Sequence, residues 1–378
     1  MKKLVRPFVD FCLDVFLFLW KRDKRIAVCS GWFGQRFADN SRYIFLYLNE
    51  NREAAHLEKV IWLTNHTQIK RELREAGYTV YMKNSIAGIY YHLRSFYFFY
   101  DQFSLDYFTF LTRGGKLIGL WHGMPIKKFG VWNGLDWNLK DEYLLTCSDW
   151  GDALIGGAFR VKPDHLIHGM YPRNYYLKQA VPYLTAEEVS LLAIVKKQKE
   201  KGKKVLFYLP TFRKSKLQFL GESDPVKIKD FFHFLSTHDY FLVTKIHYAG
   251  YSNHEDSVCY TDKDLLNLSP MADIYPFLKE TDILITDYSS VLFDFLYLDR
   301  DVICYPYDLQ AYQDKDQGLL IDYRTLPANI VCTLDELTED LLQKTDRRDS
   351  HGPARRFWLR KCFGEATITD TIHNSLQS

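Results

Sequence analysis

Short runs of apolar residues, each followed by polar or small residues, recur along the chain. Segment 282–308 shows the pattern most completely: an apolar run from Ile283 to Ile285, a polar corner, apolar positions at helical spacing, and a second apolar run from Val302 to Cys304. Continuous apolar runs are typical of parallel strands that are covered on both faces. The segment therefore predicts a strand, a helix and a second strand of an α/β sheet.

The polar corner of this segment contains Asp287, Ser289 and Ser290. Aspartate and serine at such a position accept hydrogen bonds from the first N–H groups of a helix. The remaining N–H groups, together with the helix dipole, can bind a phosphate. Two interpretations follow: an ordinary capped corner, or a binding site for a phosphate group.

The same order of apolar strand and polar cluster occurs elsewhere in the chain. Open α/β sheets bind ligands at the carboxyl ends of their strands, so we expect these clusters to line one shared crevice. The pairs are RIAVCS before Gly31 to Gly34, VIWLT before Asn65-His66, KLIGL before Trp121-His122-Gly123, YLLTC before Ser148-Asp149, HLIHG before Tyr171 to Asn174, KVLFYL before Pro210 to Arg213, and FLVTKI before His247.

Length and element order predict two α/β domains. A chain of 378 residues exceeds what one hydrophobic core usually spans. A charged helical stretch from Thr185 to Lys204 separates the two sets of strands. We expect an N-terminal helix over residues 1–24, a first α/β domain over 25–180, and a second over 181–378 with a final helix that can cross back to the first.

The N-terminal segment is a candidate for membrane contact. Residues 8–20 are strongly apolar, but Asp10 and Asp14 interrupt them, and the run is shorter than the roughly 20 residues that span a bilayer. Basic flanks around a Phe/Leu/Trp helix suit a segment that lies in the membrane interface. The alternative is a helix packed against the protein. The flanking cations are Lys2, Lys3, Arg6, Lys21, Arg22, Lys24 and Arg25.

Composition and missing motifs narrow the function classes. A net charge of +2 does not support a nucleic-acid binder. The 7 cysteines are scattered without a CxxC pair, which indicates reduced core thiols rather than a zinc site or disulfides. The absence of GxGxxG, GxxxxGK[ST] and GxSxG argues against dinucleotide-dependent oxidoreductases, P-loop enzymes and α/β-hydrolases. No DxD or HxxxH cluster is present near the candidate residues, so we expect no metal and no cofactor.

Five residues at strand ends could carry chemistry. His122 follows a strand and precedes small residues, so it can approach a substrate and act as a base. Lys245 and His247 alternate along one strand end and share a face. Arg173 and Arg213 each follow a strand, and arginine offers a planar fork to phosphate oxygens. Together they suit a reaction in which cations stabilise a phosphate leaving group while a base activates a hydroxyl.

Several ordered motifs resemble those of the CDP-glycerol glycerophosphotransferases, the family of teichoic-acid primases and polymerases. WHGMPIKKFG resembles the family's WHGTPLKKxG, YLPTFRKS its YxPTWR, MYPRN its GxPRND turn, and LVTKIH its LxLKxHP. TDILITDYSSVLFDFLYLDRDVICYPYDLQAY is similar to the longest family motif almost residue by residue. NSRYIFLYL and MKNSIAGIYYHL resemble weaker elements. The resemblance covers Gly31 to Val331.

This resemblance implies a fold and an activity. The fold is of GT-B type, in which two Rossmann-like domains face a cleft, the first for the acceptor and the second for the CDP donor. The activity is transfer of glycerol phosphate from CDP-glycerol to a hydroxyl of a lipid-linked or polymer acceptor, with release of CMP. The implied setting is the cytoplasmic face of the cell membrane, in teichoic-acid or capsule synthesis, without nucleic acid.

The resemblance also assigns roles by position in the motifs. His122 is the expected base, and His247 is the expected second essential histidine, acting on the donor pyrophosphate. The residues that we expect on the donor side are Arg173, Thr211, Arg213, Lys245, Asp287, Ser289 and Ser290.

Departures from the family motifs keep alternatives open. Met124 stands where the family has threonine, and Gln317 stands where it has arginine. CDP-ribitol or another CDP-alditol is therefore an alternative donor. A GT-B glycosyltransferase that uses a nucleotide sugar is a second enzyme class, and a scaffold with a vestigial pocket is a third possibility. Retention of both histidines argues against the scaffold.

Overall fold

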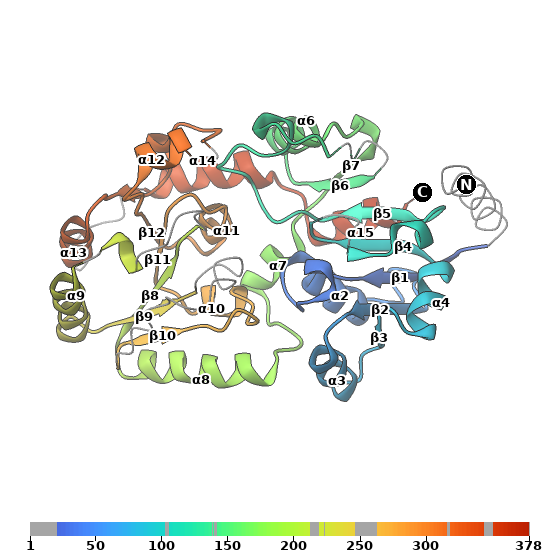
Figure 1. Cartoon of the computed structure of the whole chain (residues 1–378), viewed down its shortest axis with the longest axis horizontal. Coiled ribbons are helices and arrows are strands. Elements are labelled where there is room, and N and C mark those ends of the chain that lie inside the picture. The colour runs from blue at the N-terminus through green and yellow to red at the C-terminus, as the bar shows by residue number, and fades with distance from the viewer. Residues whose placement is uncertain are drawn as a thin grey trace, which may run out of the picture.

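A computed structural model describes residues 21–102, 106–137, 139, 142–211, 219–222, 224–245, 263–315, 318–343 and 351–377. In this part of the chain, two parallel sheets lie side by side, each flanked by helices (Figure 1). This arrangement confirms the predicted α/β class. The predicted boundaries at residues 24/25 and 180/181 stay predictions, and the apolar segment 8–20 lies outside the described residues.

The first sheet has the strand order β3-β2-β1-β4-β5-β6-β7, with all neighbours parallel. The order reverses between β1 and β4, so the carboxyl ends of these two strands border a crevice. The strands are β1 (Asp23–Cys29), β2 (Lys59–Thr64), β3 (Val80–Met82), β4 (Ser95–Tyr100), β5 (Lys116–Gly119), β6 (Tyr143–Thr146) and β7 (Leu166–His168).

The second sheet has the order β10-β9-β8-β11-β12-β13, also with parallel neighbours. Its order reverses between β8 and β11, where Leu209 is in register with Thr286, so both strands end at the same level. The strands are β8 (Lys204–Leu209), β9 (Tyr240–Thr244), β10 (Leu265–Asn267), β11 (Ile283–Thr286), β12 (Asp301–Cys304) and β13 (Asn329–Ile330).

Helices connect successive strands and pack on both faces of the sheets. The longest, α8, begins with a capping box in which Thr185 and Glu188 bond reciprocally. The helices are α2 (Asp39–Glu50), α3 (Thr67–Glu75), α4 (Ile86–Arg94), α5 (Asp149–Gly151), α6 (Gly157–Phe159), α7 (Pro172–Lys178), α8 (Ala186–Glu200), α9 (Pro225–Thr237), α10 (Tyr275–Leu278), α11 (Val291–Phe295), α12 (Leu309–Lys315), α13 (Leu334–Gln343), α14 (Gly352–Phe363) and α15 (Ile368–Leu376).

Shorter helical turns complete the description. Most are single 3₁₀ turns, and one is a π-helical stretch between α5 and α6. They are η1 (Trp32–Gly34), η3 (Thr109–Leu111), η4 (Gly130–Asn133), η5 (Asp152–Gly156, the π stretch), η6 (Pro163–His165), η7 (Phe219–Gly221), η9 (Leu296–Leu298) and η10 (Tyr323–Thr325).

Side chains that alternate along β8 pack against helices on both faces of the second sheet. Leu206 and Tyr208 of β8 pack in a cluster with residues of α9 and α13. Val205 and Phe207, which point to the opposite face, belong to a second cluster that includes α8 and α11. Because helices cover both faces, all positions of β8 after the exposed Lys204 are buried, as the sequence predicts for parallel strands.

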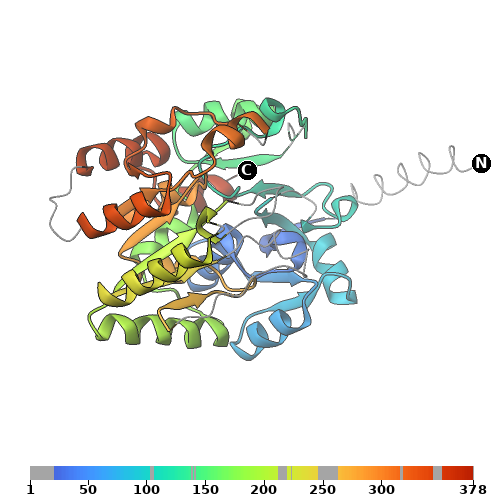
Figure 2. The ribbon, with the colours of Figure 1, turned by 60° about the vertical axis from the view of Figure 1, so that its left-hand side comes forward.

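The two halves share one core and are linked by the C-terminal helices. The largest hydrophobic cluster runs without a break from α2 and α7 of the first half to α10 and α11 of the second. After α14 the chain returns to the first sheet, where Tyr97 Oη donates to the Leu376 carbonyl at 2.7 Å and Lys116 Nζ to the Gln377 carbonyl at 2.6 Å. In Figures 1 and 2 the C-terminus accordingly lies beside the first sheet.

Segment 282–308 forms the predicted elements. It comprises β11, then α11 continued by η9, and then β12. The corner is capped in part: Ser289 Oγ accepts from Val291 N at 3.4 Å, whereas Ser290 makes no side-chain capping bond.

One residue of the N-terminal flank has a different environment from the one the sequence suggests. Arg22 is grouped there with cations that could face a membrane, but its guanidinium donates to the carbonyls of His92, Ser95, Leu111 and Arg113. Burial lowers its pKa to about 10. Arg22 therefore fastens the start of β1 to the end of α4. None of the described helices has the length and apolar character needed to cross a bilayer.

Candidate active site

A cleft of about 580 Å³ lies between the two halves, at the carboxyl ends of strands from both sheets. It brings together most of the residues that the sequence predicts for the site. Those that line it are His122, Arg173, Thr211, Lys245, Ser289 and Ser290. Asp287 lies directly behind Thr211, while Arg213 and His247 lie outside the described residues. Two other predicted clusters, Asn65-His66 and Ser148-Asp149, do not line the cleft.

The turn that carries His122 follows β5 and has an unusual backbone. Trp121 has φ +55° and Gly123 has φ +115°, both in the left-handed half of conformational space. A Cβ at Gly123 would lie 2.4 Å from Arg173 Nη2 and 3.0 Å from Ser290 Oγ. Glycine is therefore required, because the turn passes directly over these two side chains.

Contacts from both halves hold this turn. In the first half, Asn40 Nδ2 donates to the Trp121 carbonyl at 2.8 Å. In the second half, Ser290 Oγ donates to the His122 carbonyl at 3.3 Å. The half-buried imidazole of His122 also stacks near the Trp121 ring, with the ring centres 3.9 Å apart. The turn that carries the histidine is thus held between the two halves.

The corner between β8 and β11 is built around Asp287. Its Oδ1 accepts hydrogen bonds from Thr211 N at 2.8 Å and from Tyr288 N at 2.6 Å. Its carbonyl accepts from Tyr323 Oη at 2.7 Å. The carboxylate therefore fixes the loop after β8 against the loop after β11. The geometry explains how Asp287 positions Thr211. Direct contact of either residue with the CDP donor stays a prediction.

Ser289 and Ser290 present backbone donors to the cleft. Within the described residues, their N–H groups donate no hydrogen bond. Both residues line the cleft at the start of α11. Free N–H groups at such a corner can bind phosphate oxygens, so the geometry is compatible with the phosphate interpretation.

Arg173 links the two halves through buried ion pairs. Its Nη1 contacts Asp39 Oδ1 of α2 at 2.5 Å, and its Nη2 contacts Asp294 Oδ2 of α11 at 2.7 Å. Burial opposes the charged form, but Asp294, Tyr275 and Asp39 hold the pKa of Arg173 above its ordinary value. Because both terminal nitrogens bind protein carboxylates, Arg173 has a structural role at the base of the cleft. Its predicted contact with the donor stays a prediction.

Lys245 is a buried cation of the cleft wall. Lys245 is 6% exposed, and its ammonium donates to the Ala272 carbonyl. Burial and the charge of Arg36 lower its pKa to about 7. A lysine at this pKa changes its charge near neutral pH and can take up a proton when an anion binds.

Sequence reasoning missed Arg36, Asp39 and Asn40, which lie on the segment after β1. Arg36 and Asp39 line the cleft, and Asn40 supports it through its bond to the Trp121 carbonyl. Asp39 and Asn40 begin α2, at the edge of the NSRYIFLYL element that resembles the family. For Asp39 and Asn40, the sequence signal was a polar helix start that follows a buried strand. Nothing local in the sequence indicates that Arg36 reaches the second half.

A backbone bridge spans the two halves at one end of the cleft. Lys128 N donates to the Gly318 carbonyl at 3.2 Å, and Leu320 N donates to the Ile126 carbonyl at 2.8 Å. Lys127 and Leu319 form an antiparallel bridge between them. The loop that follows His122 is therefore anchored on the second half.

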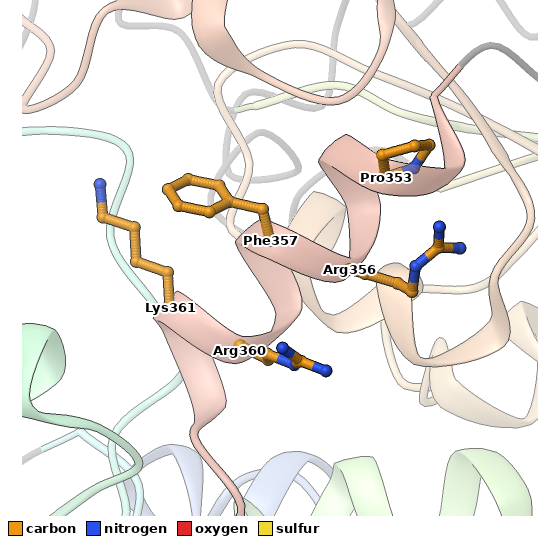
Figure 3. Close-up of a pocket in the computed structure, with 5 residues that line it drawn as sticks. All are labelled: Pro353, Arg356, Phe357, Arg360 and Lys361. Atoms are coloured by element: carbon orange, nitrogen blue, oxygen red, sulfur yellow. The ribbon is translucent and has the colours of Figure 1, made fainter.

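A second hollow lies on the outer face of α14 and has a volume of about 540 Å³. In Figure 3, Phe357 and Lys361 point to one side of the helix, and Arg356 and Arg360 point to the other. Phe357 is 60% exposed. None of the predicted site residues lies in this hollow, which is a basic and aromatic surface rather than part of the cleft.

Among the described residues, no group of three or more His, Cys, Asp or Glu side chains is placed to hold a metal ion. The expectation of a metal-independent and cofactor-independent reaction stays a prediction, because parts of the cleft loops lie outside the described residues.

Two doubly wound parallel sheets that face a cleft lined by cations, backbone donors and a histidine define a GT-B type transferase. The chain belongs to the CDP-Glycerol:Poly(glycerophosphate) glycerophosphotransferase family, whose model matches residues 12–364. It is accordingly an enzyme of the CDP-glycerol glycerophosphotransferase type, as the sequence motifs predict.

Two full-length relatives support this assignment. The chain is 24% identical to a teichoic acid glycerol-phosphate transferase of Staphylococcus aureus, over 90% of this chain and 89% of the relative. It is 25% identical to a teichoic acid poly(glycerol phosphate) polymerase of Bacillus spizizenii, over 92% and 90% of the two chains. Among solved structures, the wall teichoic acid polymerase TagF matches with a TM-score of 0.75 and 18% identity, over 99% of this chain and 97% of that chain, which shows a shared fold.

Proposed function

We propose that this protein transfers glycerol phosphate from CDP-glycerol to a hydroxyl of a teichoic-acid type acceptor, with release of CMP. The observation that carries the proposal is the His122 turn, held by Asn40 on one side of the cleft and by Ser290 on the other. This arrangement supports a base from one half that activates an acceptor hydroxyl for attack on a donor bound to the other half.

The chemistry follows from the positions of these groups. The His122 imidazole accepts the proton of the acceptor hydroxyl, and the hydroxyl oxygen forms a bond to the phosphorus of the glycerol phosphate. The bond from that phosphorus to the oxygen shared with CMP breaks, and CMP leaves with this oxygen and its negative charge. We assign the stabilisation of that charge to Lys245 and to the N–H groups of Ser289 and Ser290, because these residues line the cleft. We assign to His247 the role that the motif implies, which is to act on the donor pyrophosphate.

Release of CMP tests the proposal. Purified protein is incubated with a lipid-linked acceptor and with CDP-glycerol, CDP-ribitol or UDP-sugars in turn, with and without a chelator. We expect CMP release with CDP-glycerol, unaffected by the chelator. Faster CMP release from CDP-ribitol than from CDP-glycerol would identify CDP-ribitol as the donor. UDP release alone would instead identify a glycosyltransferase.

A histidine pair provides a matched control for the base. His122→Ala should lower kcat by about 10²–10⁴-fold, the usual contribution of a general base. His66→Ala is the control, because His66 also follows a strand of the first sheet but does not line the cleft. Equal activity of the two variants would remove His122 from the mechanism.

We further propose that the acceptor is lipid-linked or polymeric and that the protein works as a peripheral protein at the cytoplasmic face of the cell membrane, in teichoic-acid or capsule synthesis. The basic flanks of the N-terminal segment support this location, and so does the outer surface of α14, where Phe357 and Lys361 lie on one side of the helix and Arg356 and Arg360 on the other (Figure 3). Cations beside exposed aromatic rings suit an anionic membrane surface.

Sedimentation with vesicles tests the location. Lys21→Glu combined with Arg356→Glu and Arg360→Glu should release the protein from vesicles that contain anionic lipid. Arg22 is left unchanged, because its carbonyl contacts hold the fold. Equal sedimentation of the wild type and the variant would contradict the proposed contact surfaces.

A further inference from the structure

Three consecutive residues of the loop after β1 have left-handed backbone angles. Trp32 has φ +51°, Phe33 has φ +59° and Gly34 has φ +76°. Two of the three carry large side chains, for which this region is unfavourable. Trp32 lines the cleft. Strained residues of this kind persist where the surrounding structure imposes their conformation, and they cluster at functional sites.

Hydrogen bonds from two directions hold this turn. On one side, Asp106 Oδ1 accepts from Phe33 N. On the other side, Asn65 Nδ2 donates to the Phe33 carbonyl at 3.0 Å. The Gly34 carbonyl accepts from Asn65 N at 2.7 Å and from Thr64 Oγ1 at 2.8 Å. The turn is thus clamped between Asp106 and the residues at the end of β2.

Asp106 belongs to a pair of completely buried acids beneath the loop. Its neighbour Asp101 directly follows β4, and Asp101 N donates to Asp106 Oδ2 at 3.4 Å. Asp101 Oδ1 accepts from Ser41 N, in the first turn of α2, at 2.8 Å. The two carboxyl groups therefore anchor the loop near its start, at Phe33, and at its end, at Ser41.

The loop that these acids anchor carries part of the cleft. Trp32 and Arg36 line the cleft, and the guanidinium carbon of Arg36 lies 4.8 Å from the centre of the Trp32 ring. At the end of the loop, Asn40 Nδ2 donates to the Trp121 carbonyl of the His122 turn at 2.8 Å. A change at the anchors should therefore displace a wall of the cleft together with the turn that carries the expected base.

The position of Asp106 opposes its charge. Burial raises the pKa of Asp106 to about 7, although hydrogen bonds from Phe33 N and Asp101 N and the charge of Lys83 act in the other direction. Burial, with the charges of Asp39 and Asp106, raises the pKa of Asp101 well above its ordinary value. A carboxylate held at such a cost beside a cleft is typical of a functional residue. Burial also raises the pKa values of the other titratable side chains around the pair, so they are neutral near pH 7: Cys29, Tyr100 and Tyr107.

We propose that Asp106 is a positioning residue for the acceptor: with Asp101, it holds the strained turn Trp32–Gly34 and so sets the wall of the cleft that the acceptor contacts. A charged carboxylate accepts a stronger hydrogen bond from Phe33 N than a neutral group does. Acceptor binding therefore depends on the charge of Asp106, whereas folding does not benefit from it. The inference rests on the proposed function, in which the first half receives the acceptor.

Binding titrations without turnover test this role. The probes are an octyl-linked glycerol phosphate trimer, which represents the acceptor, and CDP, which represents the donor. At pH 8, Asp106→Asn, which keeps an acceptor oxygen but removes the charge, should bind the trimer about 5–10-fold more weakly than the wild type. Asp106→Ala should lose about 10–100-fold, and both variants should bind CDP normally. Asp23→Asn is the control, because Asp23 lies at the opposite end of β1 and should affect neither affinity.

The pH dependence separates positioning from a merely structural role. The phosphodiesters of the trimer do not titrate between pH 6 and 8, so the advantage of the wild type over Asp106→Asn should grow from none to about 5–10-fold as Asp106 becomes charged. Stability should change in the opposite direction. Because the folded-state pKa of Asp106 is raised above its unfolded value of about 3.9, its contribution to the free energy of unfolding is present below pH 4 and is lost as the pH rises through 7. Denaturant unfolding from pH 4 to 8 should show this loss in the wild type and not in Asp106→Asn. Parallel affinity profiles of the two proteins would overturn the inference.

A second substitution provides a rescue. Glycine adopts a positive φ without steric cost, so Phe33→Gly should make the turn less dependent on its clamp. The double variant Asp106→Ala with Phe33→Gly should bind the trimer several-fold more tightly than Asp106→Ala alone. If Asp106→Ala does not fold, the titrations of Asp106→Asn decide.

The outcomes distinguish failure of this inference from failure of the proposed function. An equal loss of affinity for the trimer and CDP in the Asp106 variants, or no loss for either probe, would overturn the positioning role. A wild type that binds the trimer with the expected dependence on Asp106 but releases no CMP from CDP-glycerol would contradict only the proposed function. Normal CMP release combined with unchanged trimer affinity in both Asp106 variants would contradict only the positioning role.

Discussion

At the scale of single residues, Asn40 connects the parts of the cleft. Its Nδ2 donates to the Trp121 carbonyl at 2.8 Å, and its Oδ1 accepts from Arg173 N at 3.2 Å. The side chain is completely buried. This one amide therefore sets the position of the His122 turn relative to the helix that carries Arg173. Its loss should consequently lower the catalytic rate.

We expect Asn40→Ala to lower kcat by about 10–100-fold, because a catalytic group displaced by about 1 Å loses that much rate. The free energy of unfolding should fall by about 1–3 kcal/mol, the cost of leaving buried partners unbonded. Steady-state kinetics and thermal unfolding measure the two effects. Asn49→Ala is the control: Asn49 lies on the same helix, and among the described residues its amide bonds only to the Phe45 carbonyl. An unchanged kcat in Asn40→Ala would contradict this role.

A second prediction at this scale concerns Lys245 and pH. Its pKa of about 7 reflects burial and repulsion by Arg36, opposed by the acids that face it, Asp273, Glu188 and Glu187. Below pH 7 the ammonium is already charged, whereas above pH 7 a proton must be taken up when an anion binds. We expect the affinity for CDP-glycerol to fall by up to about tenfold per pH unit above pH 7.

Lys245→Arg tests this pH dependence, because arginine stays charged across the range. Titrations of CDP-glycerol at pH 6 to 9 should give a flat profile for this variant. Lys201→Arg, at an exposed lysine, should keep the slope of the wild type. A slope in Lys245→Arg equal to that of the wild type would show that another group titrates.

At the scale of elements, the loop after β5 depends on the segment before η10. Gly318, with φ +66°, accepts from Lys128 N through its carbonyl, and this bond helps to close one end of the cleft. A side chain at Gly318 meets nothing closer than 3.5 Å, so backbone strain rather than collision limits substitution. The bridge thus depends on one residue that tolerates a left-handed conformation.

We expect Gly318→Ala to lower stability by roughly 1–2 kcal/mol, the cost of the left-handed conformation for alanine, and to raise the KM for the donor several-fold. Gly134→Ala is matched for strain, because Gly134 has φ +72° and open space around it, but it lies outside the bridge. Both variants should lose similar stability, and only Gly318→Ala should change KM. A change of KM in both would point to a general effect of strain.

At the scale of the whole molecule, the halves are joined by buried ion pairs within a continuous core. Arg42 of α2 contacts Glu188 of α8 at 2.6 Å, and Asp273 at 3.8 Å completes the cluster. Burial works against the charged carboxylate, but Arg42 and hydrogen bonds hold the pKa of Glu188 below its ordinary value. Breaking such a pair by removing one partner leaves a buried charge uncompensated.

Glu188→Gln should lower the free energy of unfolding by about 3–5 kcal/mol at pH 7. Because the folded-state pKa of Glu188 is depressed, its contribution is present above its unfolded pKa, about 4.3, and is lost as the pH falls through the folded pKa. The difference in the free energy of unfolding between the wild type and Glu188→Gln should therefore become smaller below about pH 4. Denaturant unfolding from pH 3 to 8 measures this difference, with the exposed Glu187→Gln as control. A difference that does not change with pH would contradict the assignment to charge.

Local pattern predicted much of this architecture. The apolar runs that end at Thr286 and Cys304 predict buried parallel strands, because both faces of each strand are covered and every position must be apolar. The motifs placed His122, Thr211 and Ser289 at strand ends, and in a parallel sheet strand ends meet at one edge. These features can be predicted because they depend on residues that are close in the sequence and on the regular geometry of parallel strands.

The sequence by itself therefore determined the fold class, the family and the positions at which the cleft would form. Only the tertiary structure decided which charges meet there. Arg173 was expected on the donor and is ion-paired with Asp39 and Asp294, whereas Arg36 gave no signal and lies beside the Ala272 carbonyl, 236 positions further along the chain. The physical reason is that local pattern fixes how a strand or helix is buried, but the strength and partner of a charge depend on burial and on groups from distant segments.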